Sequence, residues 1–170
     1  MSDRHLSSWP PSAPRDLDPP QTSLWVNLEN AAKANADRRC LVFYDSALTY
    51  AEFQRECERL AGYLTQECGV KKGDRVAVYM QNSPQFVLAY YAILRANAVV
   101  VPINQMNLTK AIRYMLEDSG AKVLFAAQEL APQVLPLTGG DPLSHLIVAT
   151  YSDYLRTQTE LSIPDFVRAK

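Results

Sequence analysis

The chain has 170 residues, 48% of them hydrophobic, with a formal net charge of −1 and a pI of about 6.1. This length suits one domain with a substantial core, and the near-neutral charge argues against nucleic acid or an anionic membrane as a partner. The longest uncharged apolar stretches, 86–94 and 96–103, are far shorter than the roughly 20 residues that span a bilayer, so we predict no transmembrane segment.

Residues 1–21 form a proline-rich leader that has too few aliphatic side chains to fold alone. We expect this leader to be extended or disordered, and we do not expect His5 within it to bind a ligand. Residues 22–156 alternate between helix and strand patterns and make an α/β domain. The pattern weakens beyond Tyr151, and 157–170 is predicted to be a connecting tail.

Strand patterns alternate with helix patterns along the domain, which favours an α/β fold with a mostly parallel sheet flanked by helices. Two strand segments, 75–80 and 99–101, are so apolar that we expect both to be buried. The predicted strands cover 41–44, 75–80, 99–101, 123–126 and 146–148. The predicted helices cover 23–35, 50–68, 84–97, 109–118 and 129–135.

Two helix starts carry capping signals. Thr49 and Glu52 have the spacing of a capping box, in which each side chain bonds the other residue's backbone N–H. Ser83 precedes Pro84 at the start of the third helix, as an N-cap does. Before the capping box, Asp45-Ser46 is expected to form a turn that leads directly into the second helix.

The three cysteines, Cys40, Cys57 and Cys68, form no CxxC pair. Cys57 and Cys68 fall on the apolar side of one predicted helix, where a thiol acts as a small hydrophobe. We therefore expect these thiols to pack in the core rather than to bind zinc or act in catalysis. Together with the absence of a signal peptide, they predict a reducing, cytoplasmic location.

Six stretches carry a family resemblance through their order and spacing: LTYAE at 48–52, GVKKGDRVA at 69–77, NSPQF at 82–86, AILRA at 92–96, AVVVPIN at 98–104 and LEDSGAKV at 116–123. Over 22–150 the chain resembles the amino-terminal region of the acyl-adenylate-forming superfamily, and most of all its AMP-forming fatty-acid–CoA ligases. It departs from the family pattern at two positions. Asn97 stands where the family more often has glycine, and Gln105 stands where proline is frequent.

The resemblance implies a parent enzyme that uses ATP, Mg²⁺ and CoA. In that reaction a carboxylic acid attacks the α-phosphate of ATP to give an acyl-adenylate, and the CoA thiol then displaces AMP. The resemblance also implies that the phosphate-binding loop and the later catalytic residues lie beyond residue 170. The parent would be a ligase acting on long-chain fatty acids, truncated here.

The positions of the glycines predict that this chain alone has no phosphate-binding loop and is therefore inactive. Phosphate binding requires backbone N–H groups on a glycine-rich loop, and the six glycines make neither GxGxxG nor GxxxxGK[ST]. The one adjacent pair, Gly139-Gly140, is interpreted as a turn. We therefore expect this chain alone to be no enzyme, with no catalytic residue, metal ligand or cofactor of its own.

Asn104 and Asn107 are the candidate site residues. They follow a predicted parallel strand at its carboxyl end, where open α/β sheets bind ligands, and the resemblance places them near the CoA route of the parent. The alternative is that both are turn residues ahead of the next helix, which is the preferred interpretation because asparagine favours turns. We interpret His145 as a surface histidine and Tyr90 and Tyr91 as packing residues.

Three functional hypotheses follow. The chain is the amino-terminal part of a fatty-acid–CoA ligase, whose partners are the rest of the parent, fatty acid and CoA. Alternatively, it is a self-standing α/β interaction or ligand-binding module without catalysis. A flavodoxin-like nucleotide-binding enzyme fits least, because no strand-to-helix turn carries phosphate-binding residues. Since a shortened sheet exposes an edge and apolar surface, the isolated chain is expected to self-associate, for example as a homodimer.

Overall fold

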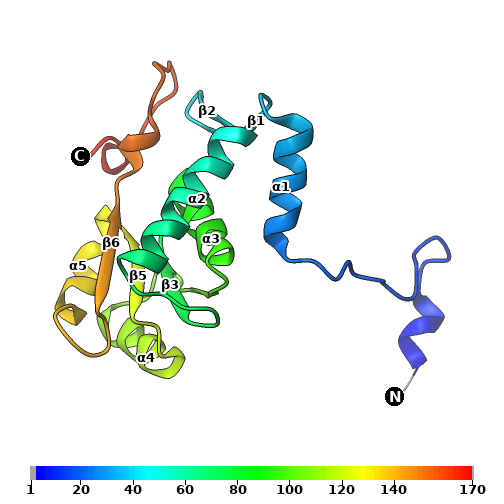
Figure 1. The fold of residues 1–170 in the computed structure, drawn as a ribbon, viewed down its shortest axis with the longest axis horizontal. Helices are drawn as coiled ribbons and strands as arrows, with labels where there is room; N and C mark the ends of the chain where they lie inside the picture. The colour runs from blue at the N-terminus through cyan, green and yellow to red at the C-terminus, as the bar shows by residue number, and fades with distance from the viewer. Residues whose placement is uncertain (1–2, 170) are drawn as a thin grey trace.

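The computed structural model describes residues 3–169, and the side chains of residues 6–169. The leader contains the short 3₁₀ helix η1 (Asp3–Ser8), and almost all of its described side chains are exposed. It projects away from the rest of the protein (Figure 1). The prediction for the His5 side chain falls outside the described side chains.

The domain opens with α1 (Leu24–Asn35), then β1 (Arg39–Phe43) and β2 (Ser46–Thr49), which pair antiparallel. The turn predicted at Asp45-Ser46 lies one residue earlier, and β2 was not predicted. The turn residues are instead Tyr44 and Asp45, with φ of 46° and 65°. Two consecutive positive φ angles match the twist of a two-residue hairpin, so the chain returns as a strand before the next helix begins.

The capping box at the start of α2 (Tyr50–Gln66) is confirmed. The Thr49 hydroxyl accepts a hydrogen bond from the Glu52 N–H at 3.2 Å, and the Glu52 carboxylate accepts one from the Thr49 N–H at 2.8 Å. Two backbone donors that the helix itself cannot satisfy are thus paired. Ser83 likewise caps α3 (Pro84–Arg95), its hydroxyl accepting from the Phe86 N–H at 3.2 Å.

The second sheet has four parallel strands in the order β4-β3-β5-β6, which confirms the predicted fold class. The strands are β3 (Arg75–Tyr79), β4 (Val99–Pro102), β5 (Val123–Ala127) and β6 (His145–Ala149). The helices that connect them are α3, α4 (Thr109–Ser119) and α5 (Ala131–Val134), with 3₁₀ turns η2 (Gln128–Leu130) and η3 (Leu135–Leu137) around α5.

One strand is less buried than its composition predicted. β3 is central and buried from Val76 onward, whereas β4 is an edge strand and Val99 is 49% exposed. The expectation of a buried strand at 99–101 was therefore wrong. Residue type alone predicted burial, but β4 pairs with β3 on one side only, and a valine run does not reveal how many neighbours a strand has.

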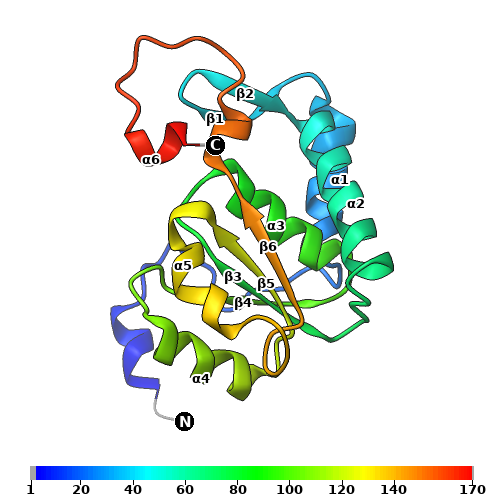
Figure 2. The ribbon, with the colours of Figure 1, turned by 90° about the vertical axis from the view of Figure 1, so that its left-hand side faces the viewer.

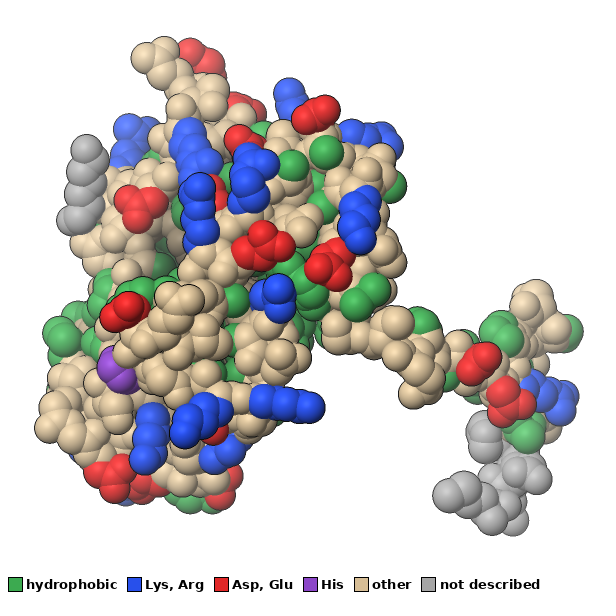
Figure 3. Space-filling view, viewed as in Figure 1, with side chains coloured by type: hydrophobic (Ala, Val, Ile, Leu, Met, Phe, Trp, Pro, Cys, Tyr) green, Lys and Arg blue, Asp and Glu red, His purple; other side chains and the backbone are tan. Residues whose placement is uncertain are grey.

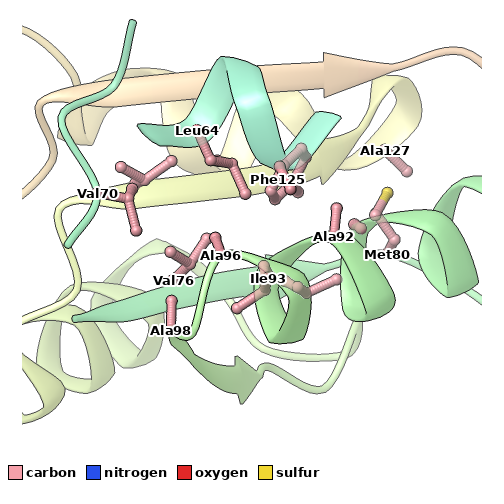
Figure 4. Close-up of a cluster of buried hydrophobic side chains, with 14 of the residues drawn as sticks. Leu64, Val70, Val76, Met80, Ala92, Ile93, Ala96, Ala98, Phe125 and Ala127 are labelled. Atoms are coloured by element: carbon pink, nitrogen blue, oxygen red, sulfur yellow. The ribbon is translucent and has the colours of Figure 1, made fainter. Parts of the chain in front are cut away.

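Helices cover both faces of the sheet (Figures 1 and 2). On one face, α2 and α3 pack against the sheet through Leu64 and Ile93, which contact a cluster that includes Val76 and Phe125 (Figure 4). On the other face, α4 and α5 pack against β3 and β5. Alternate residues of a strand point to opposite faces, so this two-sided burial explains the nearly continuous apolar sequences of β3 and β5.

The carboxy-terminal segment returns to the domain. It comprises η4 (Tyr151–Tyr154), an irregular stretch and α6 (Asp165–Arg168), in which Val167 is buried in the same cluster as Met80 and Tyr151. The Ser46 hydroxyl accepts hydrogen bonds from the N–H groups of Arg156 and Thr157 at 2.8 and 3.0 Å. In the part of the chain that the structure describes, no helix is long and apolar enough to cross a membrane.

Candidate ligand-binding edge of the sheet

The carboxyl ends of the four parallel strands meet at one edge of the sheet, which is where open α/β sheets bind ligands. The residues that follow the strands are 80–83 after β3, 103–107 after β4, 128–130 after β5 and 150–151 after β6. In Figure 2 the arrowhead of β6 points toward the β1–β2 hairpin and the carboxy-terminal segment, which lie at this end of the sheet.

The loop that contains Asn104 and Asn107 is attached to β3 by a buried tyrosine. The Tyr79 hydroxyl lies 2.6 Å from the Asn107 carbonyl oxygen and 3.1 Å from that of Gln105, so it donates to this loop. Tyr79 is 1% exposed, and its burial, reinforced by the negative charge of Glu129, raises the pKa of its hydroxyl. The phenol stays protonated, as a donor to two carbonyls must be.

Asn104 and Asn107 have turn and packing roles. Asn104 is exposed, and its side-chain oxygen accepts from the Met106 N–H at 2.9 Å, while its carbonyl accepts from the Asn107 N–H at 2.9 Å. The Asn107 amide is half-buried, with its nitrogen 3.7 Å from the sulfur of Met115. The Asn104 contacts have the geometry of an Asx-turn, a local bond that asparagine favours.

A second group of polar residues at this edge was not anticipated from the sequence. Glu129, just after β5, accepts hydrogen bonds from the Tyr151 hydroxyl at 2.8 Å and from the Gln81 amide at 3.3 Å. Its other carboxylate oxygen is buried and has no partner among the described residues. Burial, the hydrogen bond to Glu129 and the charge of Glu129 together raise the pKa of Tyr151.

Gln85 extends this polar group into the first turn of α3. Its amide nitrogen donates to the Thr150 carbonyl at 2.5 Å, while its side-chain oxygen is buried without a partner in the described part of the chain. Each of these residues directly follows a strand of the parallel sheet or lies in the next turn. That position is the signal that could have identified Gln81, Glu129 and Tyr151 from the sequence.

The glycines lie elsewhere. Gly62 is inside α2, and the other five lie in connections that lead into the amino-terminal end of β3, β5 or β6. Gly139, with φ of 91°, lies in the loop before β6, at the predicted turn. The edge built by Glu129, Gln81 and Asn104 thus has polar side chains but no glycine loop whose backbone could cradle a phosphate.

The remaining candidates lie away from this edge. His145 is exposed at the amino-terminal end of β6. Tyr91 packs edge-on against Phe53 at 5.5 Å between ring centroids. Cys57 is buried, and burial raises the pKa of its thiol. Among the described side chains, no group of three or more His, Cys, Asp or Glu residues is arranged to hold a metal ion.

Comparisons with known proteins agree with this architecture. Residues 28–166 match the family model described as AMP-binding enzyme. The long-chain-fatty-acid–CoA ligase of Salmonella typhimurium is 31% identical over 153 residues, which cover 89% of this chain and 27% of that protein. The corresponding Bacillus subtilis ligase is 30% identical over 151 residues, covering 88% and 27%. The chain therefore spans about a quarter of the length of these relatives.

Solved structures give the same result. The N-terminal domain of FACL13 from Mycobacterium tuberculosis superposes with a TM-score of 0.67 at 30% identity, over 78% of this chain and 34% of that one. The long-chain-fatty-acid-CoA ligase FadD1 of Archaeoglobus fulgidus gives a TM-score of 0.71 at 25% identity, over 79% and 28%. In sequence and in fold, this chain belongs to the AMP-binding enzyme family and resembles the amino-terminal part of its fatty-acid–CoA ligases.

Proposed function

We propose that this chain is the amino-terminal part of a fatty-acid–CoA ligase. The complete enzyme would use ATP and Mg²⁺ to convert a carboxylic acid to an acyl-adenylate, and then transfer the acyl group to CoA. The observation that carries the proposal is the match of residues 28–166 to the family, together with relatives named as long-chain-fatty-acid–CoA ligases. Their names favour long-chain acids as the substrates of the parent.

Within this proposal the chain itself is a scaffold that does not catalyse the reaction. Adenylation requires donors placed against the negative charge that develops on the phosphate. The carboxyl edge of the sheet presents the carboxylate of Glu129 and neutral amides such as that of Gln81, with no glycine loop. A carboxylate and neutral amides do not match the negative charge of a nucleoside triphosphate. We therefore assign no step of the chemistry to residues 1–170.

The loop at 103–107 is proposed to line the CoA route of the parent. Tyr79 fixes the position of this loop through the carbonyls of Gln105 and Asn107. Because Asn104 is exposed, its amide nitrogen would be available to donate to the carbonyl groups of a pantetheine chain. Asn107 contributes mainly through its place in the turn, because its own amide contacts Met115.

The rest of the parent is the proposed partner of the exposed apolar side chains beside this loop. Met106 is 80% exposed, and Leu108 and Tyr114 are each 67% exposed. These three side chains border a hollow of about 540 Å³ at the start of α4. Their exposure favours burial in a larger assembly. The three free cysteines support a cytoplasmic location for that assembly.

The inactivity of the isolated chain is tested by ATP–pyrophosphate exchange in the presence of a long-chain fatty acid. We expect no exchange above that of a protein-free control. Measurable exchange that depends on both the fatty acid and the chain would refute the scaffold role.

The parent activity is tested separately with a chimera. Residues 28–166 replace the matching segment of the Salmonella typhimurium ligase, and we expect fatty-acid-dependent exchange in the chimera. The matched control carries Ile112→Asp, which places a charge at a fully buried position of α4 and should abolish exchange. A chimera that is folded yet inactive with every fatty acid would argue for the alternative, a non-catalytic α/β module.

A further inference from the structure

The amino-terminal edge of the parallel sheet carries a hollow that the proposed function does not use. Its volume is about 420 Å³. It is bordered by the amino-terminal ends of β3, β5 and β6 and by the connection from α2 to β3. A hollow of this volume falls within the range of small-molecule pockets. It lies at the opposite edge of the sheet from Glu129 and Asn104.

Cationic side chains from three separate parts of the chain line this hollow. Lys71 comes from the connection before β3, Arg75 begins β3, and Lys122 precedes β5. Of the residues that line it, Asp74 carries the one carboxylate, and that carboxylate already accepts the Lys71 backbone N–H at 2.8 Å. Figure 3 shows Lys and Arg side chains gathered beside a histidine on the lower part of this face.

The Arg75 guanidinium is held in place by backbone carbonyls rather than by an acid. Its Nε donates to the Ser119 carbonyl at 2.6 Å and its Nη1 to the Gly73 carbonyl at 3.3 Å. Its Nη2 lies so near Gly120 that a Cβ there would be 2.7 Å away. The contact with Ser119 also satisfies a carbonyl at the end of α4. Arg75 therefore has a structural role through Nε, while its Nη2 can donate to a ligand.

The two lysines have no such structural task. The ion pairs in the described part of the chain are Arg113–Glu117 and Arg156–Glu56, and neither involves Lys71 or Lys122. Both lysines line the same hollow as Arg75. A concave surface with an excess of one sign of charge focuses the electric field and attracts a counter-ion, and here three cations face the single carboxylate of Asp74.

We infer that this hollow binds a small phosphate-bearing anion. The fixed guanidinium of Arg75 keeps Nη2 as a charged donor for one phosphate oxygen, and each lysine adds a compact positive charge. The volume leaves room for an organic group next to the phosphate. Since the hollow is remote from the carboxyl ends of the strands, the inference does not rest on the proposed ligase function.

Isothermal titration of the 170-residue chain with sodium pyrophosphate tests the inference. We expect saturable one-to-one binding, and we expect Lys122→Gln and Lys71→Gln each to weaken it about tenfold, as the loss of one charge-assisted contact does. Lys72→Gln is the matched control. It removes the same charge from the same connection, but Lys72 does not line the hollow, so its effect should stay within about twofold.

Three outcomes would overturn the inference. One is the absence of binding to the folded chain, with folding verified by circular dichroism. Another is an equal loss in Lys72→Gln and Lys122→Gln, which would indicate diffuse surface charge. The third is that citrate, an anion without phosphate, binds as tightly as pyrophosphate. Shifts of the Gly69 and Gly120 amide resonances on titration, larger than those of amides at the carboxyl edge, would locate the anion in the hollow.

Discussion

The Tyr151 hydroxyl donates a hydrogen bond of 2.8 Å to Glu129, and this contact joins the residues that follow β5 and β6. Tyr151 is 3% exposed and its phenol has a raised pKa, so it acts as a neutral donor to a charged carboxylate. A hydrogen bond to a charged group contributes more to stability than one between neutral groups. The pair therefore helps to fix the polar edge of the sheet.

We predict that Tyr151→Phe lowers the free energy of unfolding by about 1–2 kcal/mol, because Glu129 loses its shorter hydrogen bond while staying partly buried. Urea denaturation measures this change. Tyr114→Phe removes the same hydroxyl from an exposed side chain and should change stability by less than about 0.5 kcal/mol. Equal effects of the two substitutions would show that the Tyr151 contact contributes nothing specific.

The fold could be predicted largely because local signals agree with one another. The capping box at Thr49 and the glycine at 120, with φ of 68°, mark helix ends through their own backbone chemistry. The apolar sequence of β3 indicated burial on both faces, because a strand that is covered on both faces has apolar residues at successive positions. Such features depend on neighbours within a few residues, so one sequence is enough to find them.

Features that depend on distant pairing could not be predicted in this way. The hairpin strand β2 has only four residues and is defined by its partner β1. The edge position of β4 follows from strand order, which a valine run does not encode. The contact of Glu129 with Gln81 joins residues 48 positions apart. Recognising it requires knowing that β3 and β5 are neighbours in the sheet.

The capping box predicts a specific dependence of stability on pH. The pKa of Glu52 is lowered, first by the hydrogen bond from the Thr49 backbone and then by that from its hydroxyl. Its folded pKa therefore lies below its unfolded pKa, so the stabilisation is fully present above the unfolded value, about 4.3 for a glutamate. It is lost as the pH falls through the folded pKa.

The free energy of unfolding of the unmodified chain should therefore fall as the pH is lowered from about 6 to about 3, and that of Glu52→Gln should fall by less. Urea denaturation at each pH measures both curves. Glu58→Gln makes the same change at an exposed position in the middle of α2, and should leave the pH dependence close to that of the unmodified chain. If Glu52→Gln and the unmodified chain followed parallel curves, the capping carboxylate would have no role in the acid sensitivity.

Asn97 explains one departure from the family pattern in physical terms. Its φ is 57°, in the left-handed region that glycine and asparagine tolerate best. We predict that Asn97→Gly preserves stability, while Asn97→Ala lowers it by about 1 kcal/mol because alanine tolerates the left-handed region less well than asparagine or glycine does. Thermal denaturation compares both with Asn82→Ala, an exposed asparagine without a positive φ. A larger loss in Asn82→Ala would contradict this account.

Ser46 helps to hold the carboxy-terminal segment against the domain. Its buried hydroxyl accepts the N–H groups of Arg156 and Thr157, which flank a peptide bond that trypsin recognises. We predict that Ser46→Ala accelerates cleavage after Arg156 by more than about tenfold, since the two lost hydrogen bonds together make local opening easier by about 2 kcal/mol. Mass spectrometry of timed digests measures the cleavage. Ser144→Ala, at an exposed serine, should leave the rate unchanged.

The apolar side chains at the start of α4 predict how the isolated chain associates. Leu108 is 67% exposed between Met106 and Tyr114, which are also exposed. In the absence of a larger assembly, two copies can bury this surface against each other and remove apolar area from water. We therefore expect light scattering to show a concentration-dependent dimer, and Leu108→Lys to shift it toward monomer because a charge in the contact must be desolvated.

The leader supplies the matched control for this last experiment. Leu17 is 83% exposed but lies in the leader, apart from the apolar side chains at α4. Leu17→Lys adds the same charge and should leave the dimer intact. If it dissociated the dimer as well, general charge repulsion would account for the shift. If the unmodified chain stayed monomeric at millimolar concentration, the exposed apolar side chains at α4 would not drive association. That result would contradict the expected dimer and weaken the proposal that the rest of a ligase covers this surface.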